Sequence, residues 1–208
     1  MSNEPFRQMT AVTAPIIREN IDTDIIIPSR EMKSVGKQGL AEGLFAGWRY
    51  TAIGGRDLNP DFVLNKPEYA GTRFILGGSN FGCGSSREHA AWALSEYGIR
   101  AVVAPSFNPI FRGNCVRNGI VPVELPADSI AELAAQVEAD PAARQVNIDL
   151  EACIVRAPNG KEFSFALEPE AREMLLEGLD AIEITLKRRA EISAFREADR
   201  AARPWVYL

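Results

Sequence analysis

The junction at residues 72–98 constrains the fold of this chain more than any other stretch. The apolar run TRFIL is followed at once by the glycine-rich segment GGSNFGCGSS and then by REHAAWALSEYG. A short apolar run before glycines is typical of a buried strand, and the last segment has the spacing of a helix that ends at Gly98. A strand that passes through a glycine-rich turn into a helix indicates a crossover of a parallel sheet.

The same alternation continues toward the C-terminus. RAVVAP and GIVPVEL read as strands, and the helical patterns beside them span about 108–117 and 128–138. QVNIDLEACIVRA and KEFSFAL flank the turn residues 158–160, which is typical of a hairpin. The tail at 169–200 is predicted to be helical, with a break at 178–179 between two helices.

Toward the N-terminus the pattern is less regular. TAVTAPII and TDIIIPS read as short extended segments, and Pro15 and Pro28 restrict where each can lie in a sheet. From Met32 to Asp61 the chain mixes KSVGKQG, GLFAGWRY and TAIGGRDLNPD, which indicates a long excursion with one or two helical turns. Because no linker divides the sequence, we predict one α/β domain over residues 1–208, with a mostly parallel sheet flanked by helices.

Composition narrows the class of protein. The 208 residues are 46% hydrophobic, enough for a core, yet no apolar run approaches the roughly 20 residues of a membrane-spanning helix. The start, MSNEPFRQMT, has neither the basic nor the apolar part of a secretory signal, so we expect a cytoplasmic protein. A net charge of -5 argues against a broad nucleic-acid or membrane surface, so a few local cations must bind any anion.

The three cysteines do not have the spacing of a metal site. Cys83, Cys115 and Cys153 lie far apart in the sequence, and none belongs to a C-x-x-C pair. Metal sites usually take at least two ligands from one local segment. An odd number of cysteines fits free thiols in a reducing compartment. We therefore expect this chain to bind no metal by itself.

The glycine-rich segment has the features of an anion site. Ser85 and Glu88 match an S-x-x-E capping box with the helix beginning after Ser85, and Arg87 adds a planar donor for a carboxylate or phosphate. The free N–H groups and the positive end of a helix favour the same ligands. The segment lacks the frames of a P-loop, a dinucleotide fingerprint and a hydrolase elbow. Ser85 and His89, four residues apart, leave a nucleophile and base pair open.

Four motifs together resemble those of one known family. GGSNFGCGSSREHAAWAL is similar to the signature of the aconitase-superfamily swivelling domain, in the form that occurs as the separate small subunit of 3-isopropylmalate dehydratases. NIDTDIIIPS resembles the D-T-D segment of that family, LFAGWRY its middle patch and SFNPIFRGNCVRNGIVP its second helix motif. The resemblance covers nearly the whole chain. It implies a single swivelling β/β/α domain with a mobile substrate loop at about 32–61 and a helical tail at about 169–208.

The resemblance also implies an activity and a partner. Such small subunits work with a large subunit as hydro-lyases of leucine biosynthesis, which interconvert 2-isopropylmalate and 3-isopropylmalate by dehydration and rehydration. The [4Fe-4S] cluster of the family has its cysteine ligands on the large subunit, so no cofactor is expected on this chain. The expected binding partners are a large subunit and a small dicarboxylate, without nucleic acid or membrane.

Roles for three residues of the signature follow from the same resemblance. Ser85 takes the position of the catalytic base, which acts as an alkoxide and removes a proton beside a substrate carboxylate. A serine hydroxyl does not titrate near neutral pH, so its oxyanion would need nearby N–H groups and the Arg87 guanidinium. Arg87 is also expected to bind a substrate carboxylate, and Ser86 is expected to donate a hydrogen bond to it.

Four further residues are candidates for substrate binding. Thr23 and Asp24 match the family segment that borders the site, although an acidic residue beside an apolar run is also a common turn former. Lys33 and Lys37 belong to the part of the loop that reads MKSVGKQG and are candidate carboxylate contacts. From the sequence alone, this segment is equally consistent with a surface loop.

Two alternatives remain beside the dehydratase. The first is the small subunit of a homoaconitase or another malate-type hydro-lyase, because the substrate loop varies most within the family. The second is an anion-binding module without catalysis. Activity after mixing with a large subunit supports an enzyme, whereas tight diacid binding by the chain alone supports the module.

Overall fold

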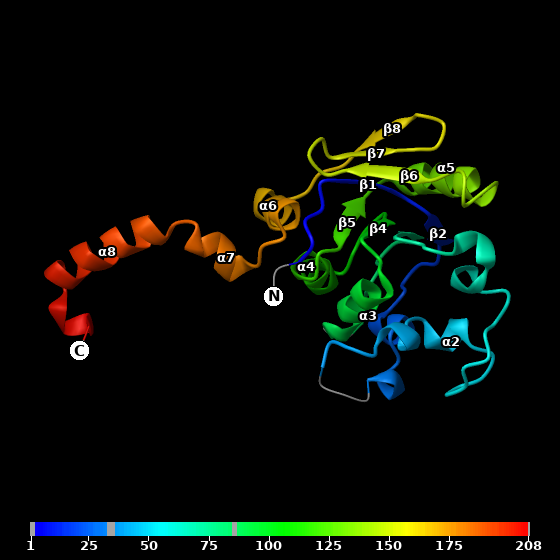
Figure 1. Ribbon diagram of the computed structural model, residues 1–208, viewed down its shortest axis with the longest axis horizontal. Coiled ribbons are helices and arrows are strands. Elements are labelled where there is room, and N and C mark those ends of the chain that lie inside the picture. Colours follow the sequence, from blue (N-terminus) through cyan, green and yellow to red (C-terminus); the bar gives the residue numbers. More distant parts are fainter. Residues whose placement is uncertain (1–2, 33–35, 85–86, 208) are drawn as a thin grey trace.

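The computed structural model describes residues 3–32, 36–84 and 87–207, and these residues contain two four-stranded sheets (Figure 1). The first sheet is parallel and has the strand order β2-β3-β4-β5. Its strands are β2 (Thr13–Ile16), β3 (Phe74–Gly77), β4 (Ala101–Ala104) and β5 (Val121–Glu124). The predicted parallel sheet is confirmed.

Both edge strands of this sheet contain a proline, Pro15 in β2 and Pro122 in β5. Because proline has no N–H to give to a ladder, it is best tolerated at a sheet edge. The central strands β3 and β4 are buried along their whole length, with the sequences FILG and AVVA. Continuous apolar runs of this kind are expected where both faces of a parallel sheet are covered.

The second sheet is antiparallel and has the order β1-β6-β7-β8. Its strands are β1 (Gln8–Ala11), β6 (Val146–Asp149), β7 (Ile154–Arg156) and β8 (Glu162–Ser164). The last two form the predicted hairpin, and Gly160 in its turn has a φ of +87°. QVNIDLEACIVRA forms two strands because the chain reverses before Cys153, whose φ is +54°.

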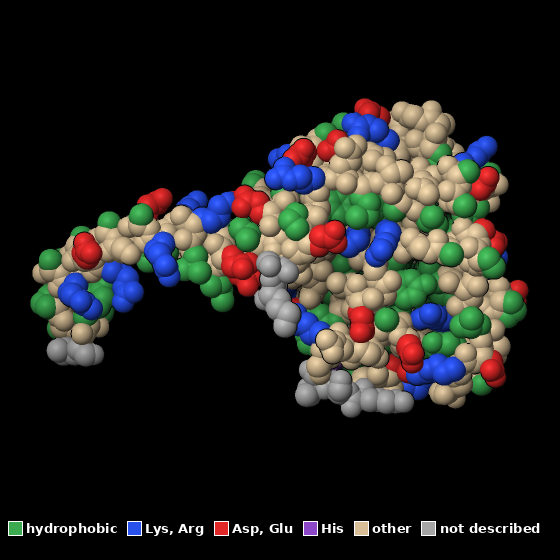
Figure 2. Space-filling view, viewed as in Figure 1, with side chains coloured by type: hydrophobic (Ala, Val, Ile, Leu, Met, Phe, Trp, Pro, Cys, Tyr) green, Lys and Arg blue, Asp and Glu red, His purple; other side chains and the backbone are tan. Residues whose placement is uncertain are grey.

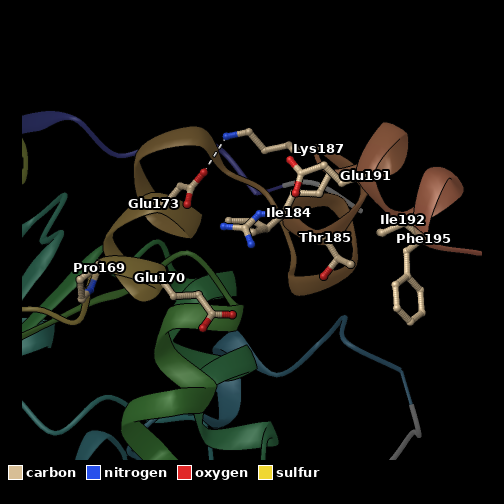
Figure 3. Close-up of a pocket in the computed structure, with 10 residues that line it drawn as sticks. Pro169, Glu170, Glu173, Ile184, Thr185, Lys187, Glu191, Ile192 and Phe195 are labelled. Carbon is tan, nitrogen blue, oxygen red and sulfur yellow. Dashed lines mark hydrogen bonds and ion pairs between the residues drawn. The ribbon is translucent and has the colours of Figure 1, made fainter. Parts of the chain in front are cut away.

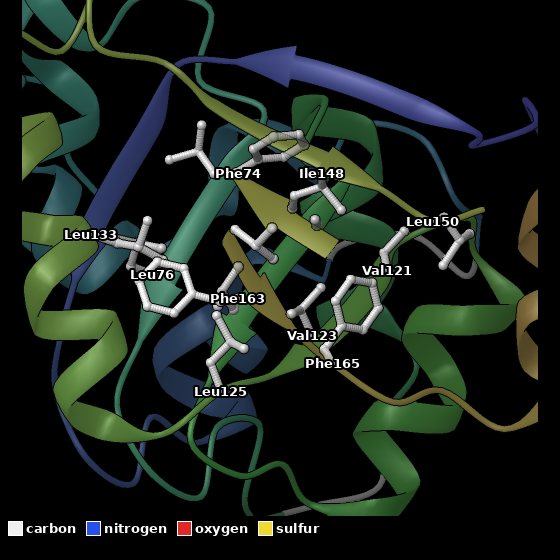
Figure 4. Packing of buried hydrophobic residues seen from close by; sticks show 14 of the residues in the cluster. Phe74, Leu76, Val121, Val123, Leu125, Leu133, Ile148, Leu150, Phe163 and Phe165 are labelled. Carbon is white, nitrogen blue, oxygen red and sulfur yellow. The ribbon is translucent and has the colours of Figure 1, made fainter. Parts of the chain in front are cut away.

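Successive residues of β3 point to opposite faces of the parallel sheet and join two different cores. Phe74 and Leu76 belong to the core between the two sheets, which also includes side chains of α5 (Ala127–Glu138). Ile75 belongs to the core on the opposite face, which we call the helix-side core. Figure 4 shows the first core, in which side chains of both sheets interleave. Burying one large apolar side chain contributes about 1.5–3 kcal/mol, so this contact between the sheets is a main source of stability.

Helices cover the other face of the parallel sheet (Figure 1). They are α3 (His89–Tyr97) and α4 (Pro109–Arg117), with α1 (Thr23–Ile26) packed against α3 and α2 (Ala46–Arg49) against α1. Asn108 caps α4, because its Oδ1 accepts from the Ile110 N–H at 3.0 Å. Gly98 ends α3 with a φ of +103°, as predicted. The layers are therefore sheet, sheet and helix, which confirms the predicted α/β class.

The prediction that TDIIIPS is extended is wrong. Its first residues form α1, because the Asp22 side chain accepts from the Ile25 N–H at 2.7 Å and caps the helix. Such a cap overrides the strand preference of the isoleucines. The short turns that follow along the chain are η1 (Ser29–Glu31), η2 (Ala41–Gly43), η3 (Val63–Asn65) and η4 (Pro67–Tyr69). With η2 and α2, the described part of the excursion has the one or two helical turns that were predicted.

The tail forms α6 (Pro169–Glu177), α7 (Ala181–Leu186), α8 (Arg189–Ala202) and η5 (Pro204–Tyr207). The predicted break at Gly178 is confirmed by its φ of +70°, but a further break before Arg189 makes three helices instead of two. α8 extends away from the body in Figure 1. We call residues 189–207 the C-terminal arm. Among the described residues, no helix is both long and apolar enough to cross a bilayer.

Candidate functional site

The glycine-rich loop, residues 77–84, runs beside the N-terminal segment at residues 18–24. Three backbone hydrogen bonds join them: Asn20 N–H to Ser79 O at 2.9 Å, Gly82 N–H to Ile21 O at 2.8 Å and Thr23 N–H to Cys83 O at 3.0 Å. Residues about sixty positions apart in the sequence are thus held together by main-chain contacts. The side chains of both segments are therefore placed by the core of the domain.

Two glycines show why this loop is built without side chains. A Cβ on Gly78 would lie 2.3 Å from the Arg18 carbonyl oxygen, closer than real Cβ atoms approach. Gly82 has a φ of +74°, and its Cβ would lie 2.1 Å from the ring of Phe111 in α4. Only glycine fits both a positive φ and so close an approach. The loop is therefore clamped between the N-terminal segment and α4.

Arg87 and Asp24, two of the predicted site residues, meet in an ion pair. The Arg87 Nη1 donates to the Asp24 Oδ1. The Arg87 side chain is 34% exposed, and a guanidinium has five N–H donors, so the pair leaves donors for a ligand. Thr23, the third predicted residue, is buried beside them at the start of α1. The structure thus brings Thr23, Asp24 and Arg87 together.

A hollow of about 420 Å³ lies at this ion pair. Its lining residues are Asp24, Ile25, Pro28, Ser29, Arg30, Gly47, Trp48 and Arg87. It therefore combines two guanidinium groups and one carboxylate with an apolar wall. We call it the Arg87 hollow. A small anion with a hydrocarbon part matches this lining, because pockets of mixed character bind the charge and the carbon skeleton separately.

Trp48 gives the hollow a rigid aromatic wall. Its ring stacks on Phe45, with 5.8 Å between the centroids and 1° between the planes. The Arg18 guanidinium also lies over the Trp48 ring, 4.6 Å from its centroid. Phe45 is fully buried in the helix-side core, so the stack ties the wall to the body. The segment GLFAGWRY therefore contributes Trp48 and Gly47 to the lining of the hollow.

Lys37 is placed elsewhere. Its Nζ lies 5.2 Å from the ring centroid of Trp92 in α3, and it does not line the Arg87 hollow. The structure therefore does not bring Lys37 together with Arg87. Ser85, Ser86 and Lys33, the other predicted site residues, lie outside the described residues.

The segment at residues 39–41, the stem of the predicted substrate loop, is anchored on α3 by Glu96. The carboxylate accepts N–H groups from Gly39 at 2.6 Å, Leu40 at 2.5 Å and Ala41 at 2.9 Å. Burial alone would raise the pKa of Glu96, but these three donors lower it below its usual value. The helix that follows the glycine-rich loop therefore also holds the stem of the predicted substrate loop. Sequence reasoning missed Glu96, because nothing in the sequence links it to residues 39–41.

The start of α3 corrects one prediction. The helix begins at His89, so it does not begin directly after Ser85 as the capping box predicted. Glu88 has no side-chain cap bond, and its Oε1 accepts from the Asn118 Nδ2 at 2.9 Å. This contact draws the Glu88 carboxylate toward the end of α4. His89 packs its ring 4.6 Å from that of Trp92, which supports a packing role for it.

A larger hollow of about 770 Å³ lies outside this region, between α6, α7 and the start of α8 (Figure 3). Lys187 reaches Glu173 there in an ion pair of 2.6 Å, and Phe195 extends from α8. None of its lining residues is a predicted site residue. Its lining includes the guanidinium of Arg188, but it contains none of the motif residues that predict an anion site. We therefore place the candidate site at the Arg87 hollow.

Comparisons with known proteins identify the family of this chain. The model of the aconitase C-terminal domain matches residues 3–128, and the LeuD_N model matches residues 131–169. A 3-isopropylmalate dehydratase small subunit from Cupriavidus necator is 58% identical over 205 residues, which is 99% of each chain. This chain belongs to the family of 3-isopropylmalate dehydratase small subunits. The family resemblance seen in the sequence is confirmed.

More distant members of the family match over similar lengths. The small subunit from Methylibium petroleiphilum is 47% identical over 98% of this chain and 97% of its own length. The crystal structure of a 3-isopropylmalate dehydratase from Methanocaldococcus jannaschii superposes with a TM-score of 0.64 at 29% identity. That match covers 91% of this chain and 99% of the other. Sequence and fold thus place the chain in the dehydratase small-subunit family over nearly its whole length.

The cysteines of this family member do not fit an iron-sulfur cluster. Cys115 is fully buried in the helix-side core. Cys153 packs on the core between the sheets, so the parallel sheet separates these two cysteines. Burial raises the pKa values of Cys115 and Cys83, and a nearby Asp22 carboxylate adds to the shift at Cys83. Within the described residues, no group of three His, Cys, Asp or Glu side chains could hold a metal ion. A cluster would need its ligands from another chain.

Sequence reasoning also missed Arg30, Glu31 and Arg56. Glu31 is buried, with a side chain that is only 5% exposed, and the Arg56 Nη2 donates to it at 2.7 Å. That hydrogen bond is the main cause of the raised pKa of Arg56. The only available signal was the charged pair in PSRE, directly after the D-T-D segment. Nothing indicated that Arg56, in the irregular excursion, would be its partner.

Proposed function

We propose that this chain is the small subunit of a 3-isopropylmalate dehydratase, a hydro-lyase that interconverts 2-isopropylmalate and 3-isopropylmalate with a large subunit. The identity of 58% over 99% of both chains to a protein of that name carries the proposal. The Arg87 hollow supports it, because its cationic and apolar lining suits a branched dicarboxylate. The family name implies the large subunit, which is absent from this structure.

Arg87 is the proposed carboxylate-binding residue of this subunit. Its ion pair with Asp24 fixes the guanidinium at the mouth of the hollow, and a pre-positioned group loses less side-chain entropy when a ligand binds. A guanidinium can hold a carboxylate through two parallel N–H donors. Asp24 then orients Arg87. Thr23 holds the start of α1 against the glycine-rich loop, because its N–H donates to the Cys83 carbonyl.

Ser85 is the proposed base that removes the proton beside the substrate carboxylate. Gly84 and Arg87, the described residues on either side of it, both lie against the segment at residues 22–24. A Cβ on Gly84 would be 3.2 Å from the Asp22 Cβ, and Arg87 pairs with Asp24. A guanidinium and main-chain N–H groups stabilise an oxyanion best where water is excluded. Closure of this site by the large subunit would provide that exclusion.

A [4Fe-4S] cluster on the large subunit would supply the Lewis-acid chemistry for the leaving hydroxyl. The cysteines of this chain do not form a site for it, so the roles of the small subunit are substrate binding and proton transfer. We propose Ser86 and Lys33 as further contacts to the substrate carboxylates; Lys37 would join them only after its side chain leaves the ring of Trp92. We also propose that residues 1–208 act as one swivelling domain and that the enzyme is cytoplasmic, where its three free cysteines would stay reduced.

Replacing Ser85 tests the catalytic proposal. We expect the Ser85→Ala small subunit, mixed with the large subunit, to lose at least about 100-fold in kcat, as is typical when a proton-transfer group is removed. Ser95→Ala is the matched control, because Ser95 is an exposed serine on the same region of the chain, in α3. Near-normal turnover by Ser85→Ala in an intact complex would refute the role of Ser85.

The wild-type mixture tests the substrate. We expect the fastest turnover with isopropylmalates, in comparison with methylmalates and carboxyalkylmalates. Faster turnover of a carboxyalkylmalate would instead indicate a homoaconitase-type small subunit. Tight diacid binding by the chain alone, without turnover in the mixture, would indicate a binding module.

A further inference from the structure

Arg30 lies in the Arg87 hollow but has no role in the proposed mechanism so far. It belongs to η1, and its side chain is 38% exposed. Within the described residues, its one ion-pair contact is to the Glu31 Oε1, where the Arg30 Nε lies at 3.4 Å. That distance is long for a charge-assisted hydrogen bond. The rest of its guanidinium is therefore available to the hollow that it lines.

Glu31 does not depend on Arg30 for its charge balance. The buried carboxylate accepts a hydrogen bond of 2.7 Å from Arg56, and this bond satisfies the charge that burial would otherwise penalise. Arg56 also lies 4.9 Å from the ring of Tyr50, which fixes it in place. Removing the Arg30 guanidinium should therefore leave the Glu31 pair intact.

The backbone at Arg30 is firmly positioned. Pro28 precedes η1, and the Glu31 N–H donates to the Pro28 carbonyl at 2.8 Å. The turn also packs on Gly43, where an added Cβ would lie 2.6 Å from the Glu31 Cβ. A guanidinium on a fixed turn at the edge of a hollow is suited to binding, because little order must be created when the ligand arrives.

We propose that Arg30 is a second carboxylate-binding residue of this site. One carboxylate of the substrate diacid binds Arg87 and the other binds Arg30, and the hydrocarbon part faces Ile25, Pro28 and Trp48. The lining carries two guanidiniums and one carboxylate, so its net charge is positive and favours the doubly negative diacid. The proposal deepens the proposed function and rests on it.

Kinetics of Arg30→Gln with the large subunit test this role. Losing a charged hydrogen-bonding group should raise the KM for 2-isopropylmalate by roughly 10- to 100-fold, with kcat changed less than about 3-fold. Arg30→Lys keeps the charge and should show a smaller increase in KM. Arg144→Gln makes the same charge change at an exposed position outside the hollow, so it should leave KM unchanged.

Two further measurements separate binding from structure. The melting temperature of Arg30→Gln should match that of the wild type, and gel filtration should show normal assembly with the large subunit. Calorimetry with succinate, an unreactive diacid, should show weaker binding to the Arg30→Gln complex than to the wild-type complex. A KM and a succinate affinity within 2-fold of wild type would overturn the proposal. So would a defect explained wholly by lost assembly, because Arg30 would then be an interface residue.

Calorimetry needs no turnover, so the two proposals can fail separately. If the wild-type mixture did not interconvert the isopropylmalates, the proposed function would fail. Succinate binding that depends on Arg30 would still support the two-guanidinium site in that case. Succinate binding that does not depend on Arg30 would refute the site.

Discussion

The glycine-rich loop and the C-terminal arm are held by different kinds of contact. The loop bonds through its main chain to residues 20–23, and the neighbouring Arg87 reaches Asp24, 63 positions away. Within the described chain, the hydrogen bonds and ion pairs of the arm join its residues to one another or to Arg188. The loop is therefore part of the cooperative core, and the arm depends on local interactions alone.

Exposure follows the same division. The loop contains Phe81, which is fully buried, whereas Phe195 and Trp205 of the arm are 65% and 67% exposed. The arm stands apart from the body on the face in Figure 2, where acidic and basic side chains are interspersed. An isolated helix of this length is only marginally stable in water. A change in the loop should thus alter the free energy of unfolding of the whole domain. A change in the arm should alter the stability of the arm alone.

The largest effect is expected from Gly82→Ala. The new Cβ would lie 2.1 Å from the Phe111 ring, and the residue must also keep a φ of +74°. Overpacking and the unfavourable φ together should lower the free energy of unfolding by about 2–4 kcal/mol, measured by denaturant titration.

Gly160→Ala is the matched control for this change. Gly160 has a similar φ of +87°, but nothing lies within 4 Å of an added Cβ. Its cost should be about 1 kcal/mol, which is the price of the backbone conformation alone. Equal costs at the two glycines would contradict a clamped loop.

A smaller effect is expected from Glu96→Gln. Gly39, Leu40 and Ala41 would lose a charged acceptor, so their amide hydrogen exchange should become roughly 3- to 10-fold faster. Glu138→Gln, an exposed change on α5, is the control and should leave these amides unchanged. Unaltered exchange at residues 39–41 in Glu96→Gln would mean that the carboxylate does not anchor the stem.

Acid should have the same effect on the wild type. The folded-state pKa of Glu96 is lowered, so its contribution is fully present above the unfolded value of about 4.3 and is lost as the pH falls through the folded pKa. Protection of residues 39–41 should therefore fall in that acidic range in the wild type. In Glu96→Gln it should show no such step.

The smallest effect is expected from removing the arm. Ending the chain after Arg188 should change the free energy of unfolding of the body by less than about 0.5 kcal/mol, because the arm adds no buried side chain to the cores. Denaturant titration of the isolated subunit measures this. A loss of more than about 1 kcal/mol would show that the arm supports the body.

The sequence predicts the regular part of this fold well, because local signals and tertiary packing agree there. The apolar strands at Phe74 and Ala101, the Asn108 cap and the Gly98 stop all lie where their chemistry indicates. The prediction for the D-T-D segment is wrong because the Asp22 cap overrides the strand propensity of the isoleucines. In the arm, a sequence pattern can predict helices but not the direction in which they leave the body.

Residues of the candidate site could be predicted only where they belong to a recognisable sequence motif. Arg87, Asp24 and Thr23 stood in recognisable motifs, and the structure brings them together. Arg30 and Glu96 could not be found in this way, because their roles depend on partners in the irregular segment at residues 39–56 and on the shape of a hollow. Contacts of that kind arise from the folded chain and have no local signature.

The central claim is that the Arg87 hollow receives the substrate diacid. A crystal structure of the assembled enzyme with a bound diacid tests it most directly. We predict one carboxylate on the Arg87 guanidinium and the Ser85 Oγ beside the acidic carbon. A diacid bound by other residues, with Arg87 still engaged only by Asp24, would contradict the account.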